Sequence, residues 1–305
     1  MRHDLVINRI ESSRNNVLNI RQCNPRPVNL DKLSVSCWTA SLGKPAFQAA
    51  FISQLSHLGF KPRRILDGRF DEAREWSFEA IHVALFCKPR WPKFPAYVIR
   101  LNPSYFGSFT DLTCFFSLAI PGFDANRTKI TVLDVSLDFR EPLPTFRQRL
   151  RVKGYHRLEC KFSREATLSL YLGDNPLYRV YDKGLEQHLG KGWFTRLELH
   201  TEKTHIPIRT FADLPKLPSL ELFKSVRLEE LNEPIAKSKL LRDFWCLYQR
   251  LGFEPAHFEF RRHRNYRRDI GRHLKVLKTE SVDHFVRKGL QAFFNSPVSS
   301  EGGLA

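Results

Sequence analysis

The sequence has no closely spaced pair of cysteines. Its six cysteines lie far apart, and none belongs to a C-x-x-C pair. This spacing argues against a zinc ribbon and against a dithiol redox motif. In a chain of 305 residues it is typical of reduced, mostly buried thiols, so we expect a cytoplasmic protein.

Long apolar runs are also absent. No stretch reaches the roughly 18 residues that a membrane-spanning helix needs, and the first residues lack the apolar segment of a signal peptide. We therefore expect neither a membrane span nor a secretory leader.

Acidic residues are scarce beside basic ones. The chain has 32 Asp and Glu against 49 Lys and Arg, a formal net charge of +17. This excess favours a polyanionic partner, with nucleic acid first. An anionic membrane surface fits less well, because no long basic amphipathic helix is evident. A soluble basic protein without such a partner is the remaining alternative.

What the sequence does contain is a set of alternating runs between residues 167 and 201. Turn clusters separate three predicted strands, at Thr167–Leu172, Leu177–Lys183 and Trp193–Thr201. If their apolar faces pack inward, the outward faces collect a phenol, cations and possible metal ligands, namely Arg179, Tyr181, Lys183, Arg196, Glu198 and His200. That set suits chemistry on a phosphate.

Other patterns predict an α+β fold. Strands are expected at 33–38, 76–87, 97–101 and 130–139, and helices at 45–58, 146–152, 235–251 and 281–294. The segment 109–118 fits either a helix or a strand. A proline-bearing connection at 206–218 is the best candidate boundary, so we expect a tail or edge segment at 1–28, a main domain at 29–215 and a helical, basic region at 216–305.

The basic region has its own charged run. Phe258–Lys278 contains eight Lys or Arg and only two acids. We expect phosphate contacts from Arg261, Arg262, Arg264, Arg267 and Arg268, and stacking of Tyr266 on an unpaired base. A solvated helix face is the alternative.

Three segments together carry a family resemblance. They read VLDVSLD (132–138), TLSLYLGDNPLYRVYDKGLEQ (167–187) and FTRLELH (194–200). In this order they resemble the replication-initiation factor family, which comprises rolling-circle initiators of plasmids and phages and relaxases of integrative conjugative elements. The R-x-Y-D-K block in the middle segment is the most specific part. The resemblance implies a catalytic domain built on an antiparallel sheet.

The resemblance also implies a reaction. Members cut one DNA strand at an origin with a tyrosine, which leaves a 5′-phosphotyrosyl link and a free 3′-OH that primes synthesis. By motif position that tyrosine resembles Tyr181. Arg179 and Lys183, two residues to either side, would favour the phenolate and hold the scissile phosphate. Glu186 could serve as general base or as a structural partner. Tyr171 is the second candidate nucleophile.

The strand after the motif predicts a divalent-ion site. Glu198 and His200 lie on one face with Cα atoms about 6.6 Å apart, which allows both to bind one cation. The same spacing is similar to the His-hydrophobic-His pair of other rolling-circle nucleases, so we expect Mg²⁺ or Mn²⁺. Asp138 is the expected third ligand, and Asp134 the partner of a basic strand neighbour.

Structural alternatives remain for these residues. Tyr181 could be an ordinary half-buried strand tyrosine, and His200 a surface histidine. Glu198 could instead form a salt bridge with Arg196 or Arg179. Arg196 is otherwise expected to contact DNA.

The resemblance further implies partners. It suggests origin DNA as duplex and single strand, a homodimer, a host helicase and polymerase, and a plasmid- or phage-borne gene in a bacterium. A conjugative relaxase with the same chemistry and a non-catalytic DNA-binding protein of the same fold are the alternatives.

Overall fold

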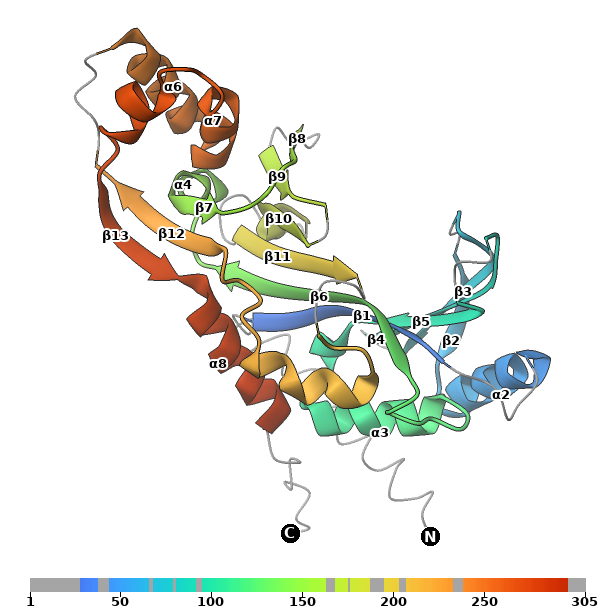
Figure 1. Cartoon of the computed structure of the whole chain (residues 1–305). Coiled ribbons are helices and arrows are strands. Elements are labelled where there is room, and N and C mark those ends of the chain that lie inside the picture. Colours follow the sequence, from blue (N-terminus) through green and yellow to red (C-terminus); the bar gives the residue numbers. More distant parts are fainter. Residues whose placement is uncertain are drawn as a thin grey trace. The chain divides into compact units, whose positions relative to one another are not determined.

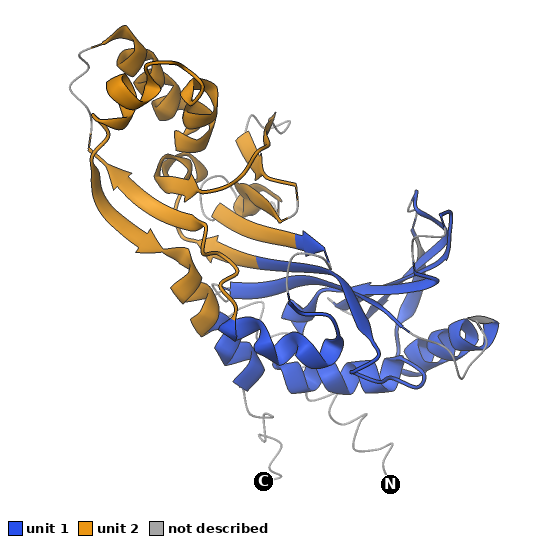
Figure 2. Ribbon diagram, viewed as in Figure 1, with its two compact units in different colours: residues 1–135, 201–219, 289–305 blue, residues 136–200, 220–288 orange. Residues whose placement is uncertain are grey.

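The chain forms two compact units that interleave along the sequence (Figures 1 and 2). The computed structural model describes residues 28–37, 44–65, 68–78, 81–91, 95–162, 168–174, 176–186, 195–202, 207–232 and 238–295. Unit 1 takes the described residues within 1–135, 201–219 and 289–305, and unit 2 those within 136–200 and 220–288. We expected consecutive domains with a boundary at residue 215. The observed units are not consecutive, because described residues within 201–219 and 289–305 also belong to unit 1.

Unit 1 is built on an antiparallel sheet. Its strands follow the order β2-β3-β4-β5-β1-β6. Their bounds are β1 Val28–Ser36, β2 Lys61–Arg64, β3 Phe70–Phe78, β4 Ile81–Pro89, β5 Tyr97–Leu101 and β6 Lys129–Phe139, of which the last four residues belong to unit 2. The expected strands at 97–101 and 130–139 are confirmed, and the one expected at 33–38 is confirmed as far as Ser36, with Trp38 outside the described residues.

Helices supply the apolar side chains that bury this sheet. They are α2 Lys44–His57, η1 Pro103–Tyr105, α3 Phe109–Ala119, η2 Phe211–Ser219 and the last turns of α8 Val282–Asn295. Helix α2 buries Phe47, Phe51 and Leu55, which recur at four-residue spacing, and the Phe51 ring packs edge-on against Trp76 at 5.9 Å.

Two sequence expectations in unit 1 need comment. The predicted strand at 76–87 is wrong as a single element, because Phe78 pairs with Ile81 and the chain reverses there from β3 into β4. The ambiguous segment at 109–118 is a helix. The Ser108 hydroxyl accepts from the Asp111 backbone N–H at 3.2 Å, which caps the start of α3.

Unit 2 contains two antiparallel sheets. The first has the order β6-β11-β10-β9-β8 and the second β13-β12-β7. The strands are β7 Leu150–Val152, β8 Leu158–Phe162, β9 Leu168–Leu172, β10 Leu177–Asp182, β11 Thr195–Glu202 with its last two residues in unit 1, β12 Val226–Leu231 and β13 Val276–Ser281. The predicted alternation holds in β9 and β10, since Leu168, Leu170, Leu172, Tyr178 and Val180 are all buried, whereas β11 is buried on both faces from Thr195 to Leu199.

The helices of unit 2 are α4 Leu143–Arg149, α5 Lys183–Glu186, α6 Lys239–Leu251, α7 Phe253–Phe260, η3 Arg267–Gly271 and most of α8. The predicted helix at 146–152 therefore ends early, and Leu150 begins β7. Helices α6, α7 and η3 lie in the chain between the paired strands β12 and β13 and share a small core around Phe244. We expected a helical C-terminal region, but it also contains the strands β12 and β13.

Helix α6 passes directly into α7 through Gly252. This glycine has φ +94°, and a Cβ there would lie 2.6 Å from the Arg147 carbonyl oxygen of α4. Only glycine permits both the backbone angle and this close approach.

The described cysteines are all free thiols, but Cys114, Cys160 and Cys246 are exposed. The expectation of mostly buried thiols was therefore wrong, and Cys23 lies outside the described residues. Among the described helices, none has the length and apolar character to cross a bilayer.

Candidate active site

Antiparallel pairing of β10 with β11 brings the predicted site residues together. In this register Arg179 stands opposite Glu198, and Tyr181 stands opposite Arg196. Alternation puts all four on one face, while Tyr178 and Val180 point into the core. The hydroxyls of Tyr178 and Ser225 share a hydrogen bond of 2.8 Å. Tyr178 is buried, which confirms its expected place in the core.

Tyr181, Glu198 and Arg179 form a linked triad. The half-buried Tyr181 donates its phenolic proton to Oε2 of Glu198 at 3.0 Å. The other carboxylate oxygen, Oε1, accepts from the Arg179 guanidinium at 2.7 Å. The Glu198 side chain is only 8% exposed, so this ion pair is partly shielded from water. The alternative that Glu198 forms a salt bridge with Arg179 is confirmed.

Arg196, which we expected to contact DNA, is buried against an acidic side chain. It forms a two-pronged ion pair with Asp138 on β6, at 2.6 Å from Nε and 2.5 Å from Nη2. The two side chains are 8% and 6% exposed. A buried guanidinium keeps such a carboxylate partner because leaving it alone would be costly.

The predicted metal ligands are tested by the same contacts. Both Asp138 oxygens face Arg196, and both Glu198 oxygens face Arg179 or Tyr181. His200 lies two residues beyond Glu198 and is half-buried. Across the described part of the chain, no three His, Cys, Asp or Glu side chains are grouped to hold one ion. As arranged, these residues do not fit Mg²⁺ or Mn²⁺.

Lys183 does not continue strand β10. Its backbone begins the short helix α5, because the Asp182 carboxylate accepts from the Leu185 N–H at 3.0 Å and caps that turn. The Lys183 ammonium forms an ion pair with Glu186 and lies 6.0 Å from the Tyr181 ring centre. Of the two roles considered for Glu186, general base and structural partner, this ion pair corresponds to the structural one. Asp182 directly before the turn is a typical capping residue, so the sequence alone could have indicated this helix start.

The second candidate, Tyr171, lies on β9 opposite Arg179. The Lys161 ammonium sits 4.5 Å from its ring centre. Among the described residues no acidic side chain bonds to the Tyr171 hydroxyl, whereas the Tyr181 hydroxyl is bonded to Glu198. In unit 1, Asp134 lies 3.7 Å from the Lys32 ammonium, so the expected basic neighbour is confirmed.

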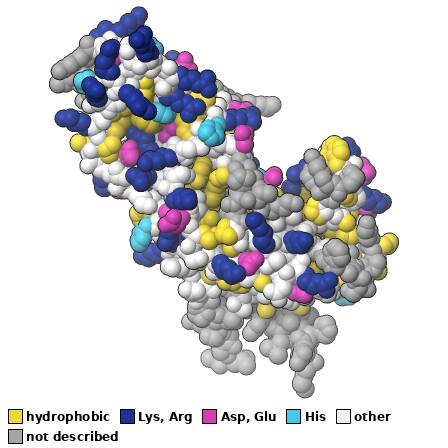
Figure 3. All heavy atoms as spheres, viewed as in Figure 1, with side chains coloured by type: hydrophobic (Ala, Val, Ile, Leu, Met, Phe, Trp, Pro, Cys, Tyr) yellow, Lys and Arg dark blue, Asp and Glu magenta, His cyan; other side chains and the backbone are white. Residues whose placement is uncertain are grey.

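The basic run at 258–278 is not one helix. It comprises the end of α7, a turn, η3 and the start of β13. Lys and Arg side chains gather on the face shown in Figure 3 over helices α6 and α7. Arg262, Arg264 and Arg267 are exposed, whereas Arg268 is paired with Asp269 at 2.6 Å and Arg261 stacks on the Phe258 ring at 4.2 Å.

Tyr266, which we expected to stack on an unpaired base, is half-buried against other aromatic side chains. Its ring packs edge-on against Phe244 at 6.3 Å, and its hydroxyl lies 2.7 Å from Nδ1 of His257. Burial raises the pKa of Tyr266 to about 12. The sequence pattern hid this role, because a tyrosine among arginines looks exposed when its long-range packing is unknown.

Comparison with known proteins adds limited information. No family model matches this sequence, and no curated protein matches it. Among solved structures, the chain is similar to a rolling-circle replication initiator protein from Geobacillus stearothermophilus, with 12% identity and a TM-score of 0.41. The match covers 74% of this chain and 97% of the other. A likeness at this level identifies neither the residues of a site nor a reaction.

Proposed function

We propose that this chain nicks and rejoins one strand of DNA, with Tyr181 as nucleophile, in the manner of a rolling-circle replication initiator. The observation that carries the proposal is the triad: a phenol within hydrogen-bond reach of a carboxylate that an arginine holds in place. A nucleophile, its base and an orienting third group are the parts that covalent catalysis needs.

The proposed step balances as follows. The Tyr181 oxygen attacks the phosphorus of a phosphodiester, and its proton passes to Glu198 at 3.0 Å. The bond from phosphorus to the 3′ oxygen breaks, and that oxygen takes a proton from solvent and leaves as a 3′-hydroxyl. A 5′-phosphotyrosyl link remains. Attack by the 3′-hydroxyl on this link reverses the step and rejoins the strand.

Arg179 has two parts in this proposal. It fixes the Glu198 carboxylate through Oε1, and it adds positive charge beside the phenol. At 28% exposure its side chain remains within reach of solvent and of a phosphate. Positive charge at this position would offset the charge that develops on the phosphate during transfer.

The net charge supports a DNA substrate. A chain of +17 with exposed arginines at 262, 264 and 267 is suited to a polyanion. Under the proposal the chain acts on origin duplex and single strand, as a homodimer, with a host helicase and polymerase extending the 3′-OH.

A plasmid assay tests the proposal. Wild-type protein should convert supercoiled plasmid carrying a candidate origin into the open-circular form and remain covalently attached to a cleaved 5′ end. Tyr181→Phe should bind the same plasmid and leave it uncut, while Tyr171→Phe should nick. Nicking by Tyr181→Phe would assign the chemistry to another residue. Binding without nicking by the wild type would leave a non-catalytic DNA-binding protein.

A further inference from the structure

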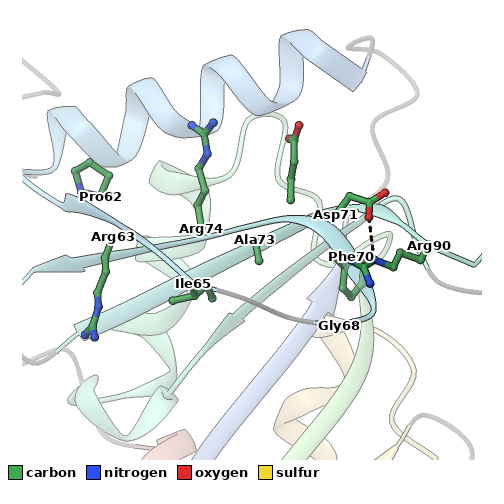
Figure 4. Close-up of a pocket in the computed structure, with 10 residues that line it drawn as sticks. Pro62, Arg63, Ile65, Gly68, Phe70, Asp71, Ala73, Arg74 and Arg90 are labelled. Carbon is green, nitrogen blue, oxygen red and sulfur yellow. Dashed lines mark hydrogen bonds and ion pairs between the residues drawn. The ribbon is translucent and has the colours of Figure 1, made fainter.

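Unit 1 contains an open pocket of about 600 Å³ that is separate in sequence from the triad. Its walls come from β2, β3 and the residue after β4 (Figure 4). Arg63, Arg74 and Arg90 contribute to these walls together with apolar side chains. No residue of the proposed nicking reaction lies in this segment of the chain.

The apolar part of the pocket belongs to a small core cluster. Phe70 and Ala73 line the pocket and are 5% and 8% exposed. The Phe70 ring packs against Phe86 at 5.5 Å, and Ile65 covers the cluster from the pocket side. This surface is fixed by packing and does not need a ligand to form.

The charged part of the pocket has a positive surplus. Its two acids are already engaged: Asp71 accepts from Arg90 at 2.8 Å, and Glu72 pairs with Lys88 and lies 3.3 Å from the Gln48 amide. Arg63 and Arg74 are exposed, and neither guanidinium has a hydrogen bond or salt bridge to another described residue, although the charge of Arg74 helps to lower the pKa of Glu72. Their charges are therefore open to an anion.

The directions in which the Arg63 and Arg74 side chains point favour a long anionic chain over a small anion. Figure 4 shows Arg63 and Arg74 extending to opposite sides of the strands. A small anion could meet only one of them. A flexible chain with a phosphate at each residue could meet both as it passes the edge strand β2.

The residue after Arg90, a lining residue of the pocket, is an exposed aromatic one. Trp91 follows Arg90 in the chain and is 48% exposed, which is unusual for so large an apolar side chain. Unpaired bases stack on such rings without sequence preference. Bases within a duplex are already stacked and would not reach it.

We propose that this edge of unit 1, defined by Arg63, Arg74, Arg90 and Trp91, binds single-stranded DNA. Arg63 and Arg74 contact phosphates on the two sides of the edge strand, and Trp91 with the apolar wall of the pocket accepts unpaired bases. This site is additional to the Tyr181 reaction and does not depend on it.

Binding of a short fluorescent oligothymidylate, followed by anisotropy, tests the inference. Arg63→Ser with Arg74→Ser should weaken binding about five- to tenfold and lower the salt slope by about 1.4, as expected for two lost phosphate contacts. Trp91→Ala should weaken binding similarly, and Trp91→Phe should restore most of it. Affinity for a hairpin duplex should change less than twofold.

The matched control removes the same charge elsewhere in unit 1. Arg127 and Lys129 are both exposed, so Arg127→Ser with Lys129→Ser should leave oligothymidylate affinity within twofold of wild type. Equal losses in the two double variants would show that only net charge matters and would overturn the site. An equal loss for oligothymidylate and hairpin would overturn the preference for single strands. Circular dichroism melts confirm that every variant is folded, and nicking by Tyr181 is scored separately.

Discussion

The phenolic oxygen of Tyr181 lies 3.0 Å from Oε2 of Glu198, across the pairing of β10 with β11. This contact links Tyr181 of the R-x-Y-D-K motif to Glu198, which the sequence had led us to expect as a metal ligand. A proton leaving the phenol has an acceptor in place, and that acceptor is itself held by Arg179. The role of Glu198 is therefore the first to test.

Glu198→Gln should slow single-turnover nicking by about 10² to 10³, because a carboxamide cannot accept the phenolic proton. DNA affinity should stay within about twofold, since the substitution removes no exposed cation. The measurement is the rate of covalent protein–DNA product under saturating protein.

Glu221→Gln is the matched control for that experiment. Glu221 is an exposed carboxylate bonded to Arg287 at 3.2 Å, so this variant also breaks one Glu–Arg pair. It should nick at the wild-type rate. A Glu198→Gln rate equal to the control would remove Glu198 from proton transfer.

Asp138→Asn separates an ion-pair role from a metal-ligand role. With Arg196 buried at 8% exposure, removing its partner charge should cost about 3 kcal/mol of unfolding free energy. Urea denaturation measures this cost. Affinity for Mn²⁺, measured by calorimetric titration, should not change, because the carboxylate is occupied by Arg196.

The reverse result would restore the sequence-based expectation. Loss of Mn²⁺ binding with wild-type stability would make Asp138 a ligand. The double variant Asp138→Asn with Arg196→Gln serves as the control, because it removes both charges. It should lose less stability than the sum of the two single variants.

Local patterns were sufficient for most of the sheet. Alternation located β6, β9 and β10, and it placed Tyr181 and Arg179 on one face, because the two-residue period of a strand depends on near neighbours alone. The same rule failed at 76–87, where an apolar run continues through the reversal between β3 and β4. It also failed at Lys183, where the Asp182 cap outweighs the strand pattern.

The partners within the site could not be predicted in the same way. Asp138 and Arg196 are 58 residues apart in sequence, and only the placement of β6 beside β11 brings them together. Sequence reasoning therefore treated both as exposed groups ready for an ion or a phosphate. Burial of a charge depends on long-range packing, and a single sequence does not reveal it.

The buried carboxyl group of Glu254 should make the free energy of unfolding depend on pH. It is 1% exposed and accepts from the Tyr155 hydroxyl and the Val152 N–H, both at 2.6 Å. Burial raises the pKa of Glu254 from 4.5 to about 7, although its hydrogen bonds and Arg151 act in the opposite direction. Between these two values the folded chain holds a proton that the unfolded chain has released.

Stability of the wild type should therefore fall as the pH rises from about 4.5 to 7, by at most about 3 kcal/mol from this group, and level off above. Glu254→Gln cannot ionise and should lack that slope. Urea denaturation at several pH values compares the two proteins. Parallel curves for wild type and variant would show that Glu254 does not titrate in this window.

The basic segment after α7 contains two kinds of residue that one experiment can distinguish. Arg262, Arg264 and Arg267 are exposed, so replacing all three with Ser should weaken duplex binding and lower its salt slope by up to about 2.7. Tyr266→Phe, which loses the bond to His257, should instead cost about 1 kcal/mol of stability and leave duplex affinity unchanged. Anisotropy at several salt concentrations and urea denaturation give the two readouts. A Tyr266→Phe variant with normal stability but weaker binding would return this ring to the DNA interface, against its packing on Phe244.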